Sequence, residues 1–326
     1  MSDLRMSRAT ATSTPAPSVA AVGGIATSTS GGTSVDADPF WGFVALLSLA
    51  ALGLYAPSGL LFLGFIGLII LVHEGGHFVA ARRAGMEPSE FFWGFGPEIV
   101  AVERNGCRYG IKALFLGGYV KLWGMTPSSV LPAGVSESGT YRAASHWGRL
   151  STILAGPAVN LVTGAAAFAV ARSMAGQDAW SSFLGGWDDT WFVITATCDA
   201  LWTWVSQITG YLGFLVDPST EAPVRFMSPV SQATVTSEAV AAGWARSLQW
   251  FGILSVAIGA LNLVPLPPLD GSHAMVAVSE KVAQWVRRDR SLRFDVRRLE
   301  PVAYVTIGAL VVLSLTALVM DIRDVI

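Results

Sequence analysis

Two histidines and a glutamate stand close enough together in this sequence to do metal chemistry. They occur as His73-Glu74-Gly75-Gly76-His77, an H-E-x-x-H pattern. On a helix, residues i and i+4 point the same way, so both imidazoles can bind one Zn²⁺. Glu74 lies one turn from His77 and can reach a water beside the metal as a general base. The alternative is a pair of histidines that merely form hydrogen bonds between helices.

A catalytic zinc needs three protein ligands and one open position, so a third ligand must come from elsewhere. In soluble enzymes an extension of the pattern places a histidine six residues on, where this chain has Arg83. Asp270 is the favoured candidate, because three prolines break an apolar segment just before it. Irregular backbone at membrane depth is tolerated where it lines a site. The alternative is a nearby glutamate, of which the chain offers Glu87, Glu90 and Glu98.

The elements that must position these residues are membrane helices. The 326 residues are 52% hydrophobic and 13% charged, which is about half the charge of a soluble domain. We therefore predict an α-helical polytopic integral membrane protein with a small membrane-associated β element and about five transmembrane helices. The predicted spans lie at about 40–56, 60–82, 147–171, 241–264 and 301–320. A net charge of −2 leaves no electrostatic footprint for nucleic acid.

The chain divides into a tail and a membrane domain. Residues 1–38 consist mostly of Ser, Thr, Ala, Gly and Pro, which predicts a disordered tail, and residues 39–326 form the domain. Basic residues outnumber acids in 82–149, which includes the loop 84–146, and in 281–300, whereas acids prevail in 172–240. The positive-inside rule therefore places the first two stretches in the cytoplasm and the third outside. The expected location is the cell membrane, which the chain crosses several times.

The outer stretch, about 172–240, is rich in tryptophan. Residues 191–216 are apolar enough to span a membrane, with Asp199 as their only charge. A single further span would, however, break the parity between the spans at 147–171 and 241–264. Tryptophan settles at membrane interfaces, so we expect this segment to lie in the interface.

Five motifs together resemble one known family, the site-2 protease family of intramembrane zinc metalloproteases, and in particular its bacterial members of regulated intramembrane proteolysis. Two of them are the H-E-x-x-H at 73–77 and the N-x-x-P-x-P-x-L-D-G at 262–271. The other three follow the family's order: Gly94-Phe95-Gly96-Pro97, Gly117-Gly118-Tyr119-Val120-Lys121 and Ala155-Gly156-Pro157-Ala158-Val159-Asn160. The chain departs from the family in having no recognisable PDZ domain in its outer segment.

The resemblance implies a metalloendopeptidase with one Zn²⁺, held by His73, His77 and Asp270, and with Glu74 as the base. It also implies that Asn160 and Asn262 lie near the site and hold the substrate backbone or the developing oxyanion. The alternative for both asparagines is hydrogen bonding between helices. The implied partner is a transmembrane protein or peptide in the lipid bilayer, such as an anti-sigma factor or a signal-peptide remnant.

A hairpin loop is predicted at about 90–125. Asn105-Gly106 is a strong type I′ turn signal between the strand-like stretches 99–102 and 109–115. In the family that the chain resembles, the corresponding loop dips into the membrane as a small sheet. An unpaired edge there needs a partner, and an unwound substrate could supply it by strand addition. The alternative is an ordinary cytoplasmic hairpin.

Two other functional classes stay open at this point. A metal-binding membrane transporter would need further ligands within the membrane, and His146 and His273 are the only other histidines. A proteolytically inactive binder of membrane segments would have no need for Glu74 or for a full set of ligands.

Overall fold

The computed structural model describes residues 35–125, 129–210, 213, 227–289, 292–294 and 296–323. Nearly all of the predicted tail, 1–38, therefore lies outside the described residues. Its last part does not match the prediction of disorder, because Val35–Ala37 form a short strand, β1. Asp38 then caps the first helix, and its side chain accepts hydrogen bonds from the backbone N–H groups of Phe40 and Trp41.

Helices occupy all five positions predicted as spans. They are α1 (Pro39–Tyr55), α2 (Pro57–Arg83), α3 (His146–Met174), α7 (Trp244–Asn262) and α9 (Glu300–Arg323). Among the described residues, α2, α3 and α9 are the helices long and apolar enough to cross a membrane, and α1 is a shorter apolar helix. The predicted class, a helical membrane protein with a small sheet, is confirmed. The predicted span at α7 is not among the three helices that are both long enough and apolar enough to cross a membrane.

The core forms where α3 packs against its neighbours. It contacts α2, α7, the helix α4 (Ala179–Ser206) and the helix α8 (Asp270–Arg287). Small residues allow the closest approach: a Cβ on Gly252 of α7 would lie 2.8 Å from the ring of Phe168 on α3. Such close contacts between small residues hold membrane helices together, since lipid provides no hydrophobic drive. The described chain also contains a short helix, α6 (Pro229–Ala241), and two 3-10 turns (Glu137–Gly139 and Val296–Leu299).

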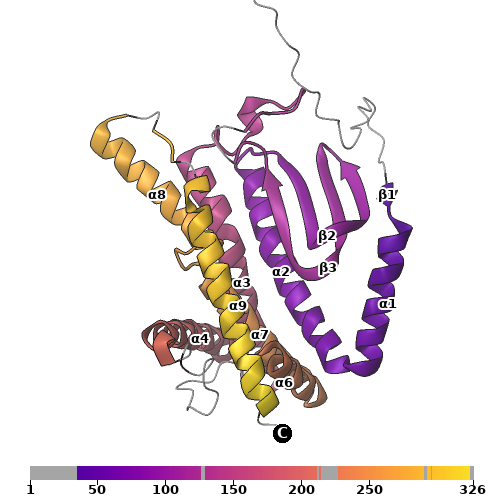
Figure 1. Cartoon of the computed structure of the whole chain (residues 1–326). Coiled ribbons are helices and arrows are strands. Elements are labelled where there is room, and N and C mark those ends of the chain that lie inside the picture. The colour runs from indigo at the N-terminus through magenta and orange to yellow at the C-terminus, as the bar shows by residue number, and fades with distance from the viewer. Residues whose placement is uncertain are drawn as a thin grey trace, which may run out of the picture. The chain divides into compact units, whose positions relative to one another are not determined.

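Much of the tryptophan-rich segment forms the long helix α4, which starts twelve residues before the stretch 191–216 and ends at Ser206. Residues 211–212 and 214–216 of that stretch lie outside the described residues. Figure 1 shows α4 crosswise to α2, α3 and α9. Arg172 at the end of α3 holds α4 through an ion pair with Asp189, at 2.7 Å. The rings of Trp180, Trp191 and Trp202 are largely exposed. This arrangement agrees with a helix in the interface, which stays a prediction.

The sheet has the order β1-β2-β3, with β2 at Pro88–Arg104 and β3 at Cys107–Leu122. The predicted turn is present, since Asn105 and Gly106 have φ of 52° and 72°, and a type I′ turn requires positive φ at both positions. Figure 1 shows the sheet between α1 and α2, and both helices contact it. The hairpin therefore packs between two apolar helices, which agrees with a membrane-associated sheet; its location stays a prediction.

Both long strands bend, so that one stretch of β2 pairs with two different stretches of β3. Residues 90–93 pair with 108–111 and also with 118–121. Gly94 and Gly96, with φ of +95° and +80°, allow the bend in β2, because glycine adopts positive φ without steric cost.

The bend decides which strand has a free edge. Residues 99–102 lie between β1 and β3, and residues 109–111 lie between the two halves of β2. A Cβ on Gly110 would accordingly touch Phe92 on one side and Val100 on the other. Within the described chain, residues 117–122 have a strand partner on one side only. Residues 99–102 and 109–111 are therefore flanked on both sides, and the outer edges of the described sheet are β1 and the stretch 117–122.

Candidate metal centre

Three side chains meet at one point although they are far apart in the sequence. His73 Nε2 lies 2.9 Å from Asp270 Oδ2, and His77 Nε2 lies 3.2 Å from the same oxygen. The two imidazole Nε2 atoms are 3.2 Å apart. His73 and Asp270 are 197 residues apart in the chain. In the described chain this is the group of His, Cys, Asp and Glu residues that could hold a metal ion.

The spacing of these three atoms fits a zinc ion. Donors about 2.0–2.1 Å from a tetrahedral Zn²⁺ lie roughly 3.3 Å from one another, close to the separations observed. His73 is buried, and the side chain of Asp270 is only 23% exposed. Burying three such groups without a cation would leave a carboxylate against two imidazoles in an apolar environment. Two imidazoles and one carboxylate, with a fourth position open, are the donors of a catalytic zinc.

The backbone of α3 makes room for the two rings. A Cβ on Gly156 would collide with ring nitrogens of both His73 and His77, so only glycine fits at this position. From the sequence, Gly156 was recognised as part of a family motif but was not assigned this purpose. The signal was present, because a glycine inside an apolar helix lowers helix propensity and calls for a packing reason.

Each histidine is oriented through its other ring nitrogen. His77 Nδ1 lies 2.8 Å from the carbonyl oxygen of Thr152, and His73 Nδ1 lies 3.2 Å from the Asn160 amide. Partners of this kind fix the tautomer and the orientation of metal-binding imidazoles. Both come from α3, which therefore acts as the support of the pair on α2. The role of Thr152 was invisible in the sequence, because a backbone carbonyl leaves no residue-type signal.

The Asn160 amide provides a further test of whether a metal fits. As placed, its Nδ2 faces His73 Nδ1, while its Oδ1 is buried without a hydrogen-bond partner. A metal on His73 Nε2 requires the proton on Nδ1, which needs an acceptor. Rotating the amide by 180° exchanges two atoms that crystallography itself rarely distinguishes. Oδ1 would then accept from His73 Nδ1–H, so the metal-binding tautomer satisfies the orphaned oxygen.

Glu74 lies beside this cluster without being one of its three members. Together with His77 and Asp270 it lines a cavity of about 200 Å³. Gly118 of β3 packs against it, since a Cβ there would lie 3.3 Å from Glu74 Cγ. Val120, on the same stretch of β3, lines the cavity together with Glu74. The free edge of the sheet therefore runs past the carboxylate.

The remaining sequence candidates lie elsewhere. Glu90 bonds to Lys121 and Tyr119, and Glu98 pairs with Arg108 and Lys112. Glu87 is exposed and its carboxylate lies against Gly139. None of the three alternative glutamates reaches the histidines.

Of the two asparagines, only Asn160 contacts the cluster in the described structure. Asn262 donates to the carbonyl oxygen of Ile258, 3.0 Å away on its own helix. The position of Asn160 behind His73 suits orientation of that ring. The expected roles of both asparagines in binding substrate stay predictions.

Two groups near the cavity have shifted pKa values. Burial raises the pKa of Tyr141 to about 12, so this cavity-lining phenol stays neutral at physiological pH. Partial burial works to raise the pKa of Glu90, but hydrogen bonds from Lys121 and Tyr119 outweigh it and hold the pKa below its ordinary value. Glu90 therefore stays ionised and pairs the two parts of the sheet nearest the site.

A buried ion pair sets the position of α8 and hence of Asp270 at its first turn. Arg149 Nη1 on α3 lies 2.8 Å from Glu280 Oε2 on α8, and the two side chains are only 6% and 5% exposed. Glu280 Oε1 also accepts a hydrogen bond from the backbone N–H of Phe294. This pair was not predicted from the sequence, because neither residue stands in a recognisable pattern.

We expect Arg149→Met to destabilise the protein by about 3–5 kcal/mol, because it leaves a buried carboxylate uncompensated. It should also lower zinc content, since α8 carries Asp270. Adding Glu280→Gln removes the stranded charge and keeps an oxygen for Phe294, so the double variant should recover most of the lost stability. Thermal unfolding in detergent and elemental analysis measure both effects. A double variant no more stable than Arg149→Met would contradict this role.

Apolar helices that bring an H-E-x-x-H pair onto a distant aspartate define a membrane metalloprotease. The sequence profile of peptidase family M50 matches residues 61–296. The chain therefore belongs to peptidase family M50, the site-2 protease family, and is a metalloendopeptidase. Zinc is the cofactor that its donor set and its family define.

Individual relatives agree. The chain is 24% identical over 322 residues to a protein of Brucella suis biovar 1 named as a zinc metalloprotease, which covers 68% of this chain and 85% of the relative. It is 38% identical over 108 residues to zinc metalloprotease Rip1 of Mycobacterium tuberculosis, which covers 33% of this chain and 26% of that protein. A protein of Clostridium acetobutylicum, also named as a zinc metalloprotease, is 36% identical over 104 residues, 32% of this chain and 29% of the relative.

Proposed function

We propose that this protein is an intramembrane endopeptidase that hydrolyses peptide bonds in or near transmembrane segments of membrane proteins. The observation that carries the proposal is the depth of the site. His73 lies ten residues before Arg83 on α2, or about 15 Å along a helix that rises ~1.5 Å per residue. Because α2 is long and apolar enough to span, the metal cluster lies within the bilayer and not at its surface.

The proposed roles follow from the geometry. His73, His77 and Asp270 hold the zinc, and Asn160 and the Thr152 carbonyl hold the two rings in place. When bound, zinc polarises the scissile carbonyl and lowers the pKa of an attacking water. Glu74 takes the proton from that water and returns it to the leaving amine. Its place in the same cavity as His77 and Asp270 supports this role.

A substrate segment must unwind before it can react, because helical carbonyls are hydrogen-bonded within the helix. We propose that the unwound segment adds to the sheet as a strand along residues 117–122. This is the edge of the described sheet opposite β1, and it passes Glu74 at Gly118 and Val120. Strand addition would then hold the scissile bond beside the catalytic carboxylate.

Proline scanning of 117–122 tests this pairing. Each proline that removes an outward backbone N–H should raise KM by roughly two- to tenfold, as expected for one lost hydrogen bond of ~0.5–1.5 kcal/mol. Zinc content should stay normal, since the metal ligands belong to α2 and α8. Cleavage of a transmembrane peptide in proteoliposomes is the measurement.

Two comparisons separate pairing from folding. Val120→Ile keeps every backbone group and should be mild. Val100→Pro, in a strand flanked on both sides, should instead impair folding and zinc loading. The strand-addition idea fails if zinc-loaded proline variants at every position of 117–122 cleave normally.

The proposed activity is tested in cells by comparing membrane-protein fragments from wild type and from a Glu74→Gln strain. Fragments that depend on Glu74 should end within transmembrane segments or close beside them. Their identity would show whether the substrate is an anti-sigma factor, a signal-peptide remnant or another protein. Termini confined to soluble domains would overturn the intramembrane assignment. A transporter is disfavoured, because neither His146 nor His273 joins the metal cluster.

We further propose a multi-pass protein of the cell membrane whose hairpin turn faces the cytoplasm and whose helix α4 faces outward. Cys198 on α4 is exposed, whereas Cys107 is buried, so natural Cys107 would be spared on either side. An Asn105→Cys variant that also carries Cys107→Ser places an exposed thiol at the turn. An impermeant thiol reagent on intact cells should label Cys198 and spare the engineered thiol at the turn. Labelling of the engineered thiol alone would show that the protein has the opposite orientation.

A further inference from the structure

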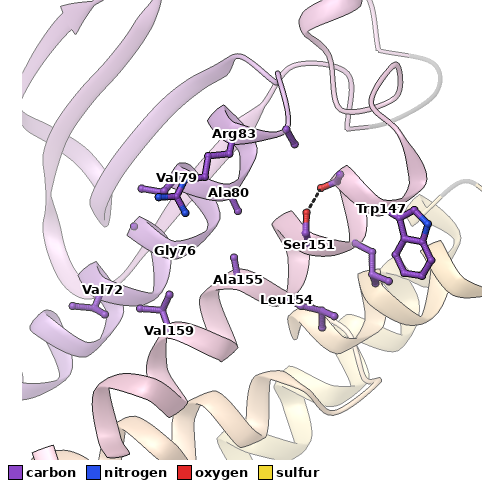
Figure 2. Close-up of a pocket in the computed structure, with 14 residues that line it drawn as sticks. Val72, Gly76, Val79, Ala80, Arg83, Trp147, Ser151, Leu154, Ala155 and Val159 are labelled. Atoms are coloured by element: carbon purple, nitrogen blue, oxygen red, sulfur yellow. Dashed lines mark hydrogen bonds between the residues drawn. The ribbon is translucent and has the colours of Figure 1, made fainter. Parts of the chain in front are cut away.

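A second hollow lies between α2 and α3, apart from the catalytic cavity. Its volume is about 990 Å³, and most of its lining is apolar. Figure 2 shows labelled side chains of both helices around it, from Val72 and Val159 at one end to Arg83 and Trp147 toward the other. We call this hollow the α2–α3 groove.

A close helix crossing separates the groove from the site. A Cβ on Gly76 would lie 2.7 Å from the carbonyl oxygen of Ala155, so the two backbones touch there. A Cβ on Gly75 would meet nothing within 4 Å, because Gly75 faces open space. The groove shares no lining residue with the cavity that holds Glu74 and Asp270. It is therefore a separate feature of the molecule.

The groove is as deep as one leaflet of a bilayer. Val72 lies eleven residues before Arg83 on α2, a rise of about 16 Å at ~1.5 Å per residue. Trp147 lies twelve residues before Val159 on α3, which gives about 18 Å by the same rise. Both lengths are close to half of the ~30 Å hydrocarbon core. A transmembrane helix would need a groove through both leaflets, whereas an acyl chain needs only one.

The two ends of the groove differ in chemistry. Among the described residues that line it, Arg83 alone is charged, and Trp147 beside that end is 73% exposed. Tryptophan and arginine are typical of the headgroup level. The neighbouring Arg82 is engaged elsewhere, over the ring of Phe78 and 3.5 Å from the Tyr109 hydroxyl. The side chain of Arg83 makes no ion pair or hydrogen bond with the described residues, so its guanidinium group is available to bind an anion.

We propose that the α2–α3 groove binds a phospholipid with an anionic headgroup. One acyl chain lies along the small residues Ala80 and Ala155 down to Val72, and the phosphate pairs with Arg83. Positive-inside orientation places Arg83 at the cytoplasmic face, whose leaflet carries the anionic lipids. The proposal rests on the membrane location of the protein but not on its catalytic activity.

Native mass spectrometry of the full-length protein, released from nanodiscs of phosphatidylglycerol and phosphatidylcholine with identical chains, tests the headgroup. Wild type should retain one phosphatidylglycerol in preference to phosphatidylcholine. Arg83→Gln should weaken this preference roughly fivefold, the factor that ~1 kcal/mol per basic residue corresponds to. Arg82→Gln is the matched control, one residue away and outside the groove, and should behave as wild type. Equal preference in wild type and Arg83→Gln would overturn the proposal.

Filling the groove tests the chain-binding part. Ala80→Phe should abolish retention of both lipids, whereas Ala158→Phe, on an exposed position of α3 outside the groove, should not. Zinc content reports folding of each variant, and Leu154→Trp replaces Ala80→Phe if that variant loses zinc. Retention equal to wild type in a zinc-loaded filled variant would show ordinary annular lipid and overturn the proposal. Unchanged lipid retention with slower peptide cleavage in detergent would assign the groove to substrate instead. Loss of lipid retention with normal peptide cleavage would support the lipid-binding proposal.

Discussion

Glu74→Gln should keep its zinc and lose its peptidase activity, with kcat lower by roughly 10²–10⁴-fold, the usual contribution of general acid–base catalysis. Glutamine has nearly the same shape, so the cavity shared with His77 and Asp270 should stay intact. An amide cannot accept the proton of the attacking water. Glu74 is also not one of the three groups that form the metal cluster. The measurement is turnover of a transmembrane peptide by purified protein, with zinc determined by elemental analysis.

Glu87→Gln provides the matched control. Glu87 is an exposed glutamate against Gly139, outside the cavity, and the same substitution there should leave kcat within about twofold, as for surface changes of ~0.5 kcal/mol or less. Full turnover by zinc-loaded Glu74→Gln would exclude Glu74 as the base. Loss of zinc from this variant would make Glu74 a ligand and require a different base.

Asp270→Asn should lose most of its zinc, because a neutral amide is a poor ligand for Zn²⁺. Asp270 supplies the one anionic oxygen of the cluster, within 3.2 Å of both imidazoles. The loss of affinity should exceed the roughly 10- to 100-fold that follows removal of a group behind a ligand. Competition with a chelator of known affinity measures this difference in the purified variants.

Two asparagine variants provide reference values for the zinc affinity of Asp270→Asn. Asn160→Ala removes the amide beside His73 Nδ1 and should weaken zinc by about 10- to 100-fold. Asn262→Ala removes a hydrogen bond within α7 alone and should leave zinc affinity unchanged. If Asp270→Asn binds zinc as wild type does, the third ligand lies elsewhere. A larger loss of zinc affinity in Asn160→Ala than in Asp270→Asn would contradict the proposed geometry.

Local sequence was enough to predict the parts of the site that depend on short spacing. The i, i+4 pair His73 and His77 shares one face of a helix whatever the rest of the fold does, because the helical period is fixed. Asn105-Gly106 likewise predicted the turn, since type I′ geometry needs residues that accept positive φ. Apolar runs predicted where helices would form, and a helix occupies each of those positions.

The choice of the third ligand was not decided by local sequence. The three prolines before Asp270 favoured it over three nearby glutamates, and the family resemblance implied it, but residue spacing alone left the glutamates open. The structure explains the outcome, because Glu90 and Glu98 are held by cations of the sheet while α8 brings Asp270 to the histidines. The ion pair between Arg149 and Glu280 that holds α8 joins residues 131 positions apart. No periodic pattern encodes a contact of that kind.

Which stretch of the sheet has a free edge could not be read from the sequence, for the same physical reason. A hairpin read from its turn has two outer edges, at 99–102 and 109–115, and either could have been open. Folding bends β2 at Gly94 and Gly96 and places its first half beside β3, while β1 covers the other side. Residues 99–102 and 109–111 are thereby paired on both sides. The open edge at 117–122 exists only because of these long-range pairings.

By itself, then, the sequence determined the reactive pair, the helices that carry it and the membrane environment, since each follows from composition and from fixed local periods. The tertiary structure decided which distant groups complete the site. Asn160, Gly156 and the carbonyl of Thr152 acquire their roles only when α3 packs against α2. The α2–α3 groove arises from the same packing, because residues of both helices line it beside the point where Gly76 meets the backbone of Ala155. Such features depend on surfaces that meet after folding, and a linear sequence displays each surface alone.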